Sequence, residues 1–146
     1  MLSDFECDVC QENSVIYNDL FEKYKDKVKF GFSNFASYVS LPAIASECAA
    51  KQNKFWEFHD TLFTTQNNLD TVDLIRIAKI LDLDIDIFKK DLISNEISSS
   101  IQQNIENLSN YGIYATPTIL INNRPIFNSS SIEEIEGILL AELEKL

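Results

Sequence analysis

The chain has 146 residues, of which 45% are hydrophobic and 24% are charged, and its formal net charge is -11. This length is typical of one folded domain, and the composition is that of a globular protein with a buried core. The excess of 23 acidic over 12 basic residues argues against nucleic acid as a partner, because phosphates repel such a surface. No apolar run reaches the length of a membrane-spanning helix, and no signal peptide is visible after Met1.

The N-terminal part of the chain predicts a short strand, a helix and a second strand. Apolar residues recur at helical spacing over 8–24, and lysines follow at the end, where the helix dipole favours cations. Val28, Phe30 and Phe32 then alternate with polar or small residues. This alternation predicts a strand that ends near Phe35.

The middle of the chain predicts four helices. The first contains Pro42 in its first turn, and the second covers the aromatic-rich segment 55–63. The third begins after Asp70, whose carboxylate is a good N-cap. We expect the fourth to be one long helix that carries the apolar residues of segment 88–108 and ends near Gly112.

The C-terminal part returns to β structure before a last helix. Segment 117–121 is a β-branched run that predicts a strand, residues 122–123 predict a hairpin turn, and 125–127 predict the returning edge strand. Ser131, with Glu134 three residues later, is a capping-box signal for the last helix. The order of elements therefore predicts an α/β protein with a helical block in the middle.

The C-x-x-C motif of residues 7–10, at the start of the first helix, is the strongest candidate for chemistry. A sulfur at a helix N-terminus lies near unsatisfied N–H groups that stabilise a thiolate, the nucleophile of disulfide exchange. The second sulfur lies one turn further on and can resolve a mixed disulfide. Two alternatives stay open: helical cysteines packed in a core, or half of a zinc site for which Cys48 and His59 are poorly spaced. Haem attachment is excluded, since residue 11 is Gln and not His.

Thr116-Pro117, directly before the predicted strand, is the second candidate feature. Proline cannot donate a ladder hydrogen bond, so this position is a sheet edge or a special turn. A cis bond here would expose the neighbouring backbone as a docking edge for an extended peptide. Thr-Pro alone is more often an ordinary trans turn, but a C-x-x-C motif about 110 residues upstream reverses that balance.

Four segments in order carry the residues and spacing of a known family: 3–10, 32–35, 48–59 and 112–118. On these segments the chain closely resembles the DsbA-like thiol–disulfide oxidoreductases of the thioredoxin fold. The resemblance covers nearly the whole sequence. It implies an α/β thioredoxin-like fold interrupted by a helical insertion.

The implied organisation is a single domain of residues 1–146. Its core would consist of about 1–36 and 112–146, and its helical insertion of about 37–111. The family has a full strand before the C-x-x-C motif, whereas only residues 1–5 are present here, so that the first sheet strand is expected to be largely missing. This difference suggests a truncated gene product, a misplaced start or a chain that borrows a strand.

The resemblance also implies roles for individual residues. Cys7 would be the nucleophile and Cys10 the resolving thiol, beside a cis Pro117, while Thr116 and Val9 would line the substrate site. No metal or organic cofactor is implied, because side chains form the redox group. The implied partners are cysteine-containing protein substrates and an unidentified redox partner, and the implied location is extracytoplasmic, either periplasmic or at the cell surface.

The residues between the two cysteines depart from the family pattern. The family usually has Pro followed by an aromatic residue or His, whereas this chain has Asp8-Val9. Asp8, with Glu6 and Asp4 adding charge of the same sign, is expected to raise the pKa of Cys7 and to make the site a weaker oxidant.

Three functions stay open. The leading one is a dithiol–disulfide oxidoreductase. The altered dipeptide favours a redox-silent thioredoxin-fold module that binds peptides or a partner, and the acidic site permits a disulfide isomerase or reductase. Cys48, Trp56 and His59 would fall in the helical insertion, where we interpret the first two as packing residues and the histidine as a packing or surface residue rather than a base.

Overall fold

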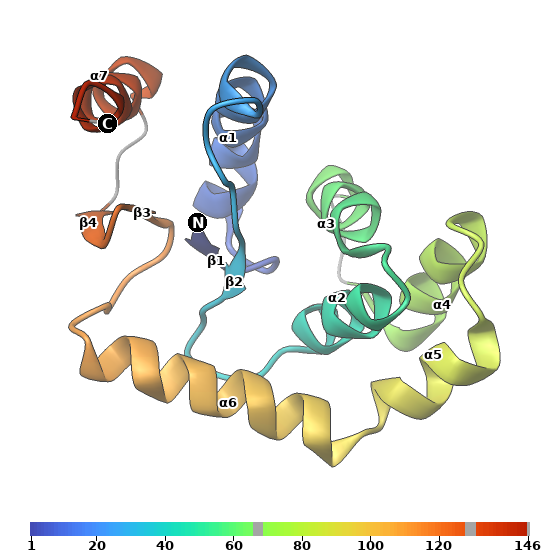
Figure 1. Cartoon of the computed structure of the whole chain (residues 1–146). Coiled ribbons are helices and arrows are strands. Elements are labelled where there is room, and N and C mark those ends of the chain that lie inside the picture. The colour runs from blue at the N-terminus through green and yellow to red at the C-terminus, as the bar shows by residue number, and fades with distance from the viewer. Residues whose placement is uncertain (66–68, 128–130, 146) are drawn as a thin grey trace. The chain divides into compact units, whose positions relative to one another are not determined.

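The computed structural model describes residues 1–65, 69–127 and 131–145 (Figure 1). The chain forms two compact units. The first comprises Met1–Phe35 and Leu108–Leu146, and the second comprises Ala36–Asn107.

The first unit is built on a mixed four-stranded sheet with the strand order β2-β1-β3-β4. Its strands are β1 (Leu2–Ser3), β2 (Ser33–Asn34), β3 (Thr118–Ile121) and β4 (Arg124–Phe127). The inner strand β1 runs parallel to β2 and antiparallel to β3, with Leu2 opposite both Ser33 and Thr118. The β3–β4 hairpin turns through Asn122 and Asn123, whose φ angles of 46° and 66° confirm the predicted turn.

Helices α1 (Asp8–Tyr24) and α7 (Ile132–Leu143) lie on the same side of this sheet (Figure 1). They enclose the core of the first unit, which is formed by Leu20, Tyr24, Ile121, Ile135 and Leu139. Burial of these side chains is the main force that holds both helices against the sheet. As the capping-box signal predicts, the Ser131 hydroxyl accepts a hydrogen bond from the Glu134 amide at 3.3 Å.

The second strand is shorter than predicted. Val28, Phe30 and Phe32 are half-buried while Lys29 and Gly31 are exposed, so the two-sided pattern is present. The ladder nevertheless covers only Ser33 and Asn34, because the partner strand β1 itself has two residues. The alternation therefore indicated which side chains face the core, but it overstated the length of the paired segment.

The second unit contains only helices in its described part. These are α2 (Leu41–Lys51), α3 (Phe55–Thr64), α4 (Thr71–Ile80), α5 (Ile85–Leu92) and most of α6 (Asn95–Asn110). Its centre is apolar: Phe58, Leu62, Leu74 and Phe88 are almost fully buried, and the rings of Phe58 and Phe88 lie 5.7 Å apart. Asp70 caps α4 as predicted and accepts hydrogen bonds from two amides of its first turn.

The predicted long helix over 88–112 is wrong, because two helices occupy this segment. α5 ends at Leu92, and α6 begins only at Asn95, after a turn in which the Ser94 amide donates to the Asp91 carbonyl at 2.9 Å. The apolar spacing does not reveal this break, because Ile93 lies four positions before Ile97 although its side chain is exposed in the structure. Ser and Asn at the break favour turns and caps over a helix interior.

Candidate active site

The C-x-x-C motif begins helix α1 directly after β1. Cys7 is the N-cap of α1, and its Sγ accepts a hydrogen bond from the Cys10 amide at 3.2 Å. The turn before it is closed by the Asp4 side chain, which accepts from the Glu6 amide at 3.0 Å. A sulfur thus occupies the position that an oxygen of Ser, Thr or Asp usually takes at a helix start.

The two sulfurs differ in accessibility. Cys7 is partly exposed and Cys10 is fully buried, and both are free thiols in this structure. Val9, between them, has 52% of its surface exposed. Cys7 and the apolar Val9 are therefore accessible to solvent, whereas Cys10 is not.

Burial controls the titration of Cys10. The pKa of this thiol is raised to about 11: burial raises it most and the hydrogen bond with Cys7 adds to this, while the Ser3 hydroxyl and the Asp4 backbone lower it. The pKa of Tyr17 is also raised, first by burial and then by the charges of Cys10 and Cys7. Neither Ser3 nor Tyr17 was singled out from the sequence, although Tyr17 follows Cys10 by seven residues and so lies on the same side of α1.

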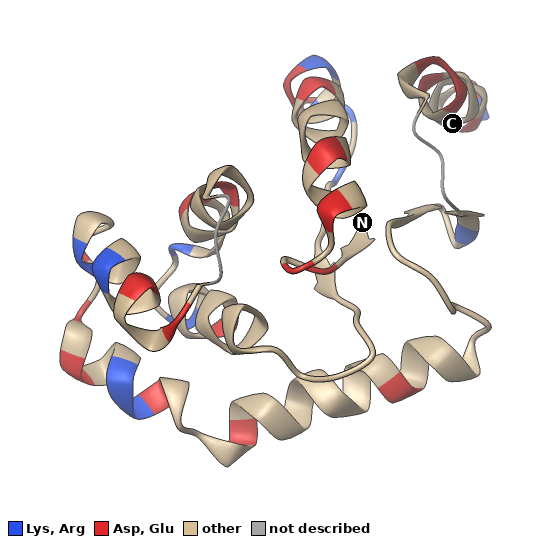
Figure 2. Cartoon of the chain, turned by 180° about the vertical axis from the view of Figure 1, so that it is seen from behind, with Lys and Arg blue, Asp and Glu red and all other residues tan. Residues whose placement is uncertain are grey.

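Acidic residues surround the start of α1. Glu6, Asp8 and Glu12 are exposed, and Figure 2 shows acidic residues in the turn before α1 and along its first turns. Asp4 is less exposed: burial raises its pKa, its hydrogen bond from the Glu6 amide lowers it, and the charge of Glu6 raises it again. The negative charge predicted around the cysteines is therefore present on the surface of this region.

The Thr116–Pro117 peptide bond is cis, and it directly precedes β3. Thr118 pairs with Leu2 in an antiparallel ladder, so the chain before Thr118 runs beside the chain after Leu2, which leads to the C-x-x-C motif. Pro117 is fully buried and Thr116 is partly exposed. The hydroxyl of Thr118 donates to the Ala115 carbonyl at 2.7 Å and closes this turn.

The remaining candidates lie in the second unit. Cys48 is fully buried, as expected for a packing residue, and burial raises its pKa to about 12. His59 is buried on α3 between the rings of Phe55, Trp56 and Phe63, and its Nδ1 lies 2.9 Å from an oxygen of Asp60. Trp56 packs on one side only, since 45% of its surface is exposed.

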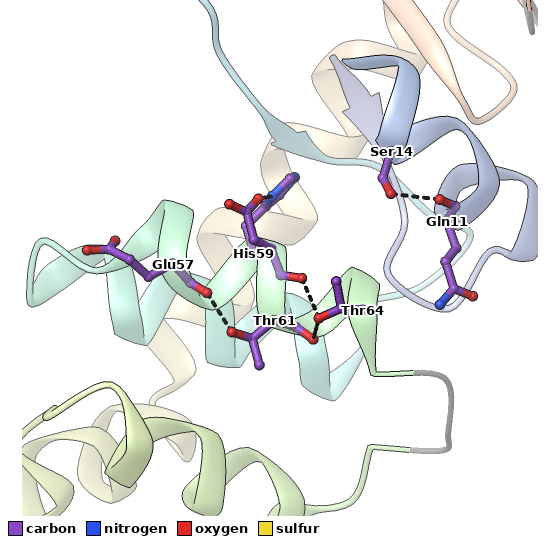
Figure 3. Close-up of polar contacts among 7 residues, drawn as sticks. Gln11, Ser14, Glu57, His59, Thr61 and Thr64 are labelled. Carbon is purple, nitrogen blue, oxygen red and sulfur yellow. Dashed lines mark hydrogen bonds and ion pairs between the residues drawn. The ribbon is translucent and has the colours of Figure 1, made fainter. Parts of the chain in front are cut away.

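The hydrogen bonds of α3 are mostly local. The Thr61 hydroxyl donates to the Glu57 carbonyl and the Thr64 hydroxyl to the Asp60 carbonyl, as Figure 3 shows, together with the bond from Ser14 to the Gln11 carbonyl in α1. In each of these bonds a hydroxyl donates to a backbone carbonyl of its own helix, so the bonds do not bring side chains of different helices together. Across the described residues, no three His, Cys, Asp or Glu side chains gather in a way that could hold a metal ion.

Comparison with known proteins agrees with this geometry. The family model described as Thioredoxin matches residues 1–141. The chain belongs to the thioredoxin family. Its fold is similar to that of the thiol-disulfide exchange protein alpha-DsbA2 of Wolbachia pipientis, on which the chain superposes with a TM-score of 0.83 at 17% identity, covering 97% of this chain and 78% of that one. Wolbachia pipientis alpha-DsbA1 gives a TM-score of 0.81 at 22% identity, covering 99% and 84%.

Two kinds of curated proteins resemble this thioredoxin-family chain in sequence. Disulfide bond formation protein D of Bacillus subtilis is 30% identical over 155 residues, which cover 97% of this chain and 70% of that protein. The Na(+)/H(+) antiporter NhaA 3 of Salinispora tropica is 30% identical over 144 residues, which cover 95% of this chain and 22% of the antiporter. The chain therefore spans about a fifth of the length of the antiporters it matches. None of the helices in the described segments combines the length and the apolar character needed to cross a bilayer.

Proposed function

We propose that this thioredoxin-family chain is a dithiol–disulfide oxidoreductase that exchanges disulfides with cysteines of protein substrates. The observation that supports this proposal is the asymmetry of the two thiols. Cys7, partly exposed at the N-cap of α1, receives a backbone hydrogen bond, while Cys10 is buried one turn further on. These are the properties of an attacking and a resolving sulfur.

The proposed reaction needs only the two thiols and the substrate. The Cys7 thiolate attacks one sulfur of a substrate disulfide, and the other sulfur leaves as a thiolate. The Cys10 thiolate then attacks Cys7 Sγ, the bond between Cys7 and the substrate breaks, and the Cys7–Cys10 disulfide forms. The substrate gains two electrons and two protons, and the reverse sequence oxidises a substrate dithiol.

We propose that the substrate binds as an extended segment along the chain at Thr116 and Pro117, with Val9 as an apolar contact. The antiparallel register of β1 and β3 supports this placement, because it brings this segment alongside the chain that leads to Cys7. Backbone hydrogen bonds would give affinity with little sequence preference. Asp8 and Glu6 would destabilise the Cys7 thiolate and make the site a weaker oxidant.

We further propose that residues 1–146 act as one domain, with a core of about 1–36 and 112–146 and an insertion of about 37–111. The two compact units of the structure support this division. The domain would meet its protein substrates and a redox partner outside the cytoplasm, where disulfides persist. The relationship to Bacillus proteins named for disulfide bond formation supports this location.

Reduction of insulin by dithiothreitol tests the proposed activity. The wild-type protein should accelerate the reaction, whereas Cys7→Ser should be inactive, because it removes the nucleophile. Cys48→Ser changes the third cysteine, which is fully buried, and should leave the activity unchanged where the variant stays folded. Identical rates for the wild type and Cys7→Ser would remove the enzymatic proposal and favour a redox-silent binding module, for which the Asp8-Val9 dipeptide already argues.

A further inference from the structure

Ser3 has a buried hydroxyl that the fold does not use. It lies on β1, an inner strand of the sheet, and it is fully buried. Its Oγ makes no hydrogen bond of normal geometry within the described part of the chain. Buried polar atoms are nearly always paired, because an unpaired one keeps its whole desolvation cost. The Ser3 hydroxyl is therefore a donor that is free to stabilise a negative charge beside it.

The available partner is Cys10. Burial raises the pKa of the Cys10 thiol and the hydrogen bond with Cys7 adds to this effect, whereas the Ser3 hydroxyl and the Asp4 backbone lower it. Ser3 and the Asp4 backbone thus both favour the thiolate form of Cys10. A neutral thiol is a weak acceptor, but a thiolate is a strong one. The donor at Ser3 gains its partner when Cys10 carries a negative charge.

We propose that Ser3 is a positioning residue that donates a hydrogen bond to the Cys10 thiolate while the Cys7–Cys10 disulfide closes or opens. This inference rests on the proposed oxidoreductase function. On closing, Cys10 gives its proton to solvent and attacks Cys7 Sγ, and the substrate sulfur leaves as a thiolate. On opening, a substrate thiolate attacks Cys7 Sγ and Cys10 itself leaves as the thiolate, so the same donor serves both directions.

Removing this donor has two opposing effects on the closing step. A hydrogen bond to a charged acceptor changes the thiolate population roughly tenfold, so Ser3→Ala lowers the fraction of Cys10 that can attack. The less stabilised thiolate is about threefold more nucleophilic, because nucleophilicity rises with basicity. Ser3→Ala should therefore close the disulfide about threefold more slowly at neutral pH, and the difference should narrow as the pH rises towards the pKa of Cys10.

Stopped-flow reaction with dithiobis(nitrobenzoate) measures this step directly. The first thionitrobenzoate is released when Cys7 attacks, at a rate proportional to the reagent concentration. The second is released when Cys10 attacks the mixed disulfide, at a rate independent of that concentration. Cys48 is fully buried and stays outside both phases. The rate of the second phase, measured against pH, should be about threefold lower for Ser3→Ala than for the wild type at neutral pH, and the two profiles should converge as the pH rises.

Matched variants separate the hydroxyl from packing. Ser3→Gly also lacks the donor and should shift the profile in the same direction as Ser3→Ala, whereas Ser3→Thr retains it and should follow the wild type. Ser46→Ala removes another fully buried serine hydroxyl, which donates to the Ala43 carbonyl, and should not shift the profile. Coinciding profiles for Ser3→Ala and the wild type, or a Ser3→Thr profile shifted like Ser3→Ala, overturn the role of Ser3. A wild type without any second phase overturns the proposed function instead.

Discussion

Replacement of either cysteine of the proposed active site should have a different effect, because Cys7 is partly exposed and Cys10 is buried. Cys10→Ala leaves the partly exposed Cys7 able to attack but removes the resolving thiol, so mixed disulfides with substrates should accumulate. Incubation of the reduced variant with a denatured, disulfide-containing substrate, quenched by alkylation and followed by non-reducing electrophoresis, measures this. The Cys7→Ala variant should accumulate almost no mixed disulfide, because its remaining thiol, Cys10, is fully buried. Equal trapping by both variants contradicts the assignment.

The charge next to Cys7 should control the reduction potential of the site. Asp8→His replaces an exposed carboxylate at the first position of α1 by a group that favours a nearby thiolate. A more stable thiolate makes the pair more oxidising, and we expect a change of about 30 mV for a tenfold effect. Equilibration with glutathione buffers measures the potential. Asp19→His, which alters an exposed aspartate further along the same helix, should change it far less.

The buried His59 should make stability depend on pH. Burial lowers its pKa from the ordinary value of 6.5, and the Asp60 carboxylate only partly compensates. The unfolded chain therefore binds the proton more readily, and stability should fall as the pH decreases through about 6.5. Urea denaturation of the wild type and His59→Phe at several pH values tests this. The variant should lose less stability over this range, and parallel losses contradict the prediction.

At the scale of elements, capping fixes where helices begin. The Asp70 carboxylate accepts hydrogen bonds from the Val72 and Asp73 amides at 2.8 and 2.9 Å. Asp70→Ala leaves both donors without this partner and should cost about 1 kcal/mol of unfolding free energy. Asp70→Ser keeps an acceptor and should cost much less. Chemical denaturation of the three proteins compares them, and an equal loss in both variants would show that the cap is not the cause.

Elements with local signals could be predicted from the sequence, and elements that depend on partners could not. The bounds of α1, the Asn122–Asn123 turn and the cap at Ser131 follow from spacing and side-chain chemistry within a few residues. The length of β2 depends on how many residues of β1 pair with it, which its own alternation does not encode. The break between α5 and α6 at Ile93–Ser94 could not be predicted, because apolar residues continue at helical spacing across it.

The candidate site shows the same division. The C-x-x-C motif and Thr116-Pro117 are readable because their residue types are rare and their spacing is informative. Ser3 is an ordinary serine in the sequence, and its proposed role rests on its full burial and on its unpaired hydroxyl. The burial of the Ser3 hydroxyl depends on the tertiary fold, and no pattern in the amino-acid sequence indicates it.

At the scale of the whole molecule, the net charge of -11 should make positively charged small disulfides react faster with the protein than negatively charged ones. Exposed acids at the start of α1 place part of this charge beside Cys7. Cystamine, a dication, should therefore oxidise the dithiol about tenfold faster than the dianion dithiodipropionate at low ionic strength. The difference should shrink in about 1 M salt, where the Debye length is about 3 Å. A ratio near one at low salt, measured by intrinsic fluorescence, contradicts this steering.

The enclosure of Cys48 in α2 turns this residue into an internal reporter. Its thiol is fully buried, and its pKa is raised to about 12, so a labelling reagent meets it only after the surrounding helices open. In a protein whose other two cysteines have reacted, the slow incorporation of a third label records the frequency of that opening. The chain thus contains its own probe for native-state fluctuations of the helical unit, with no engineered cysteine required.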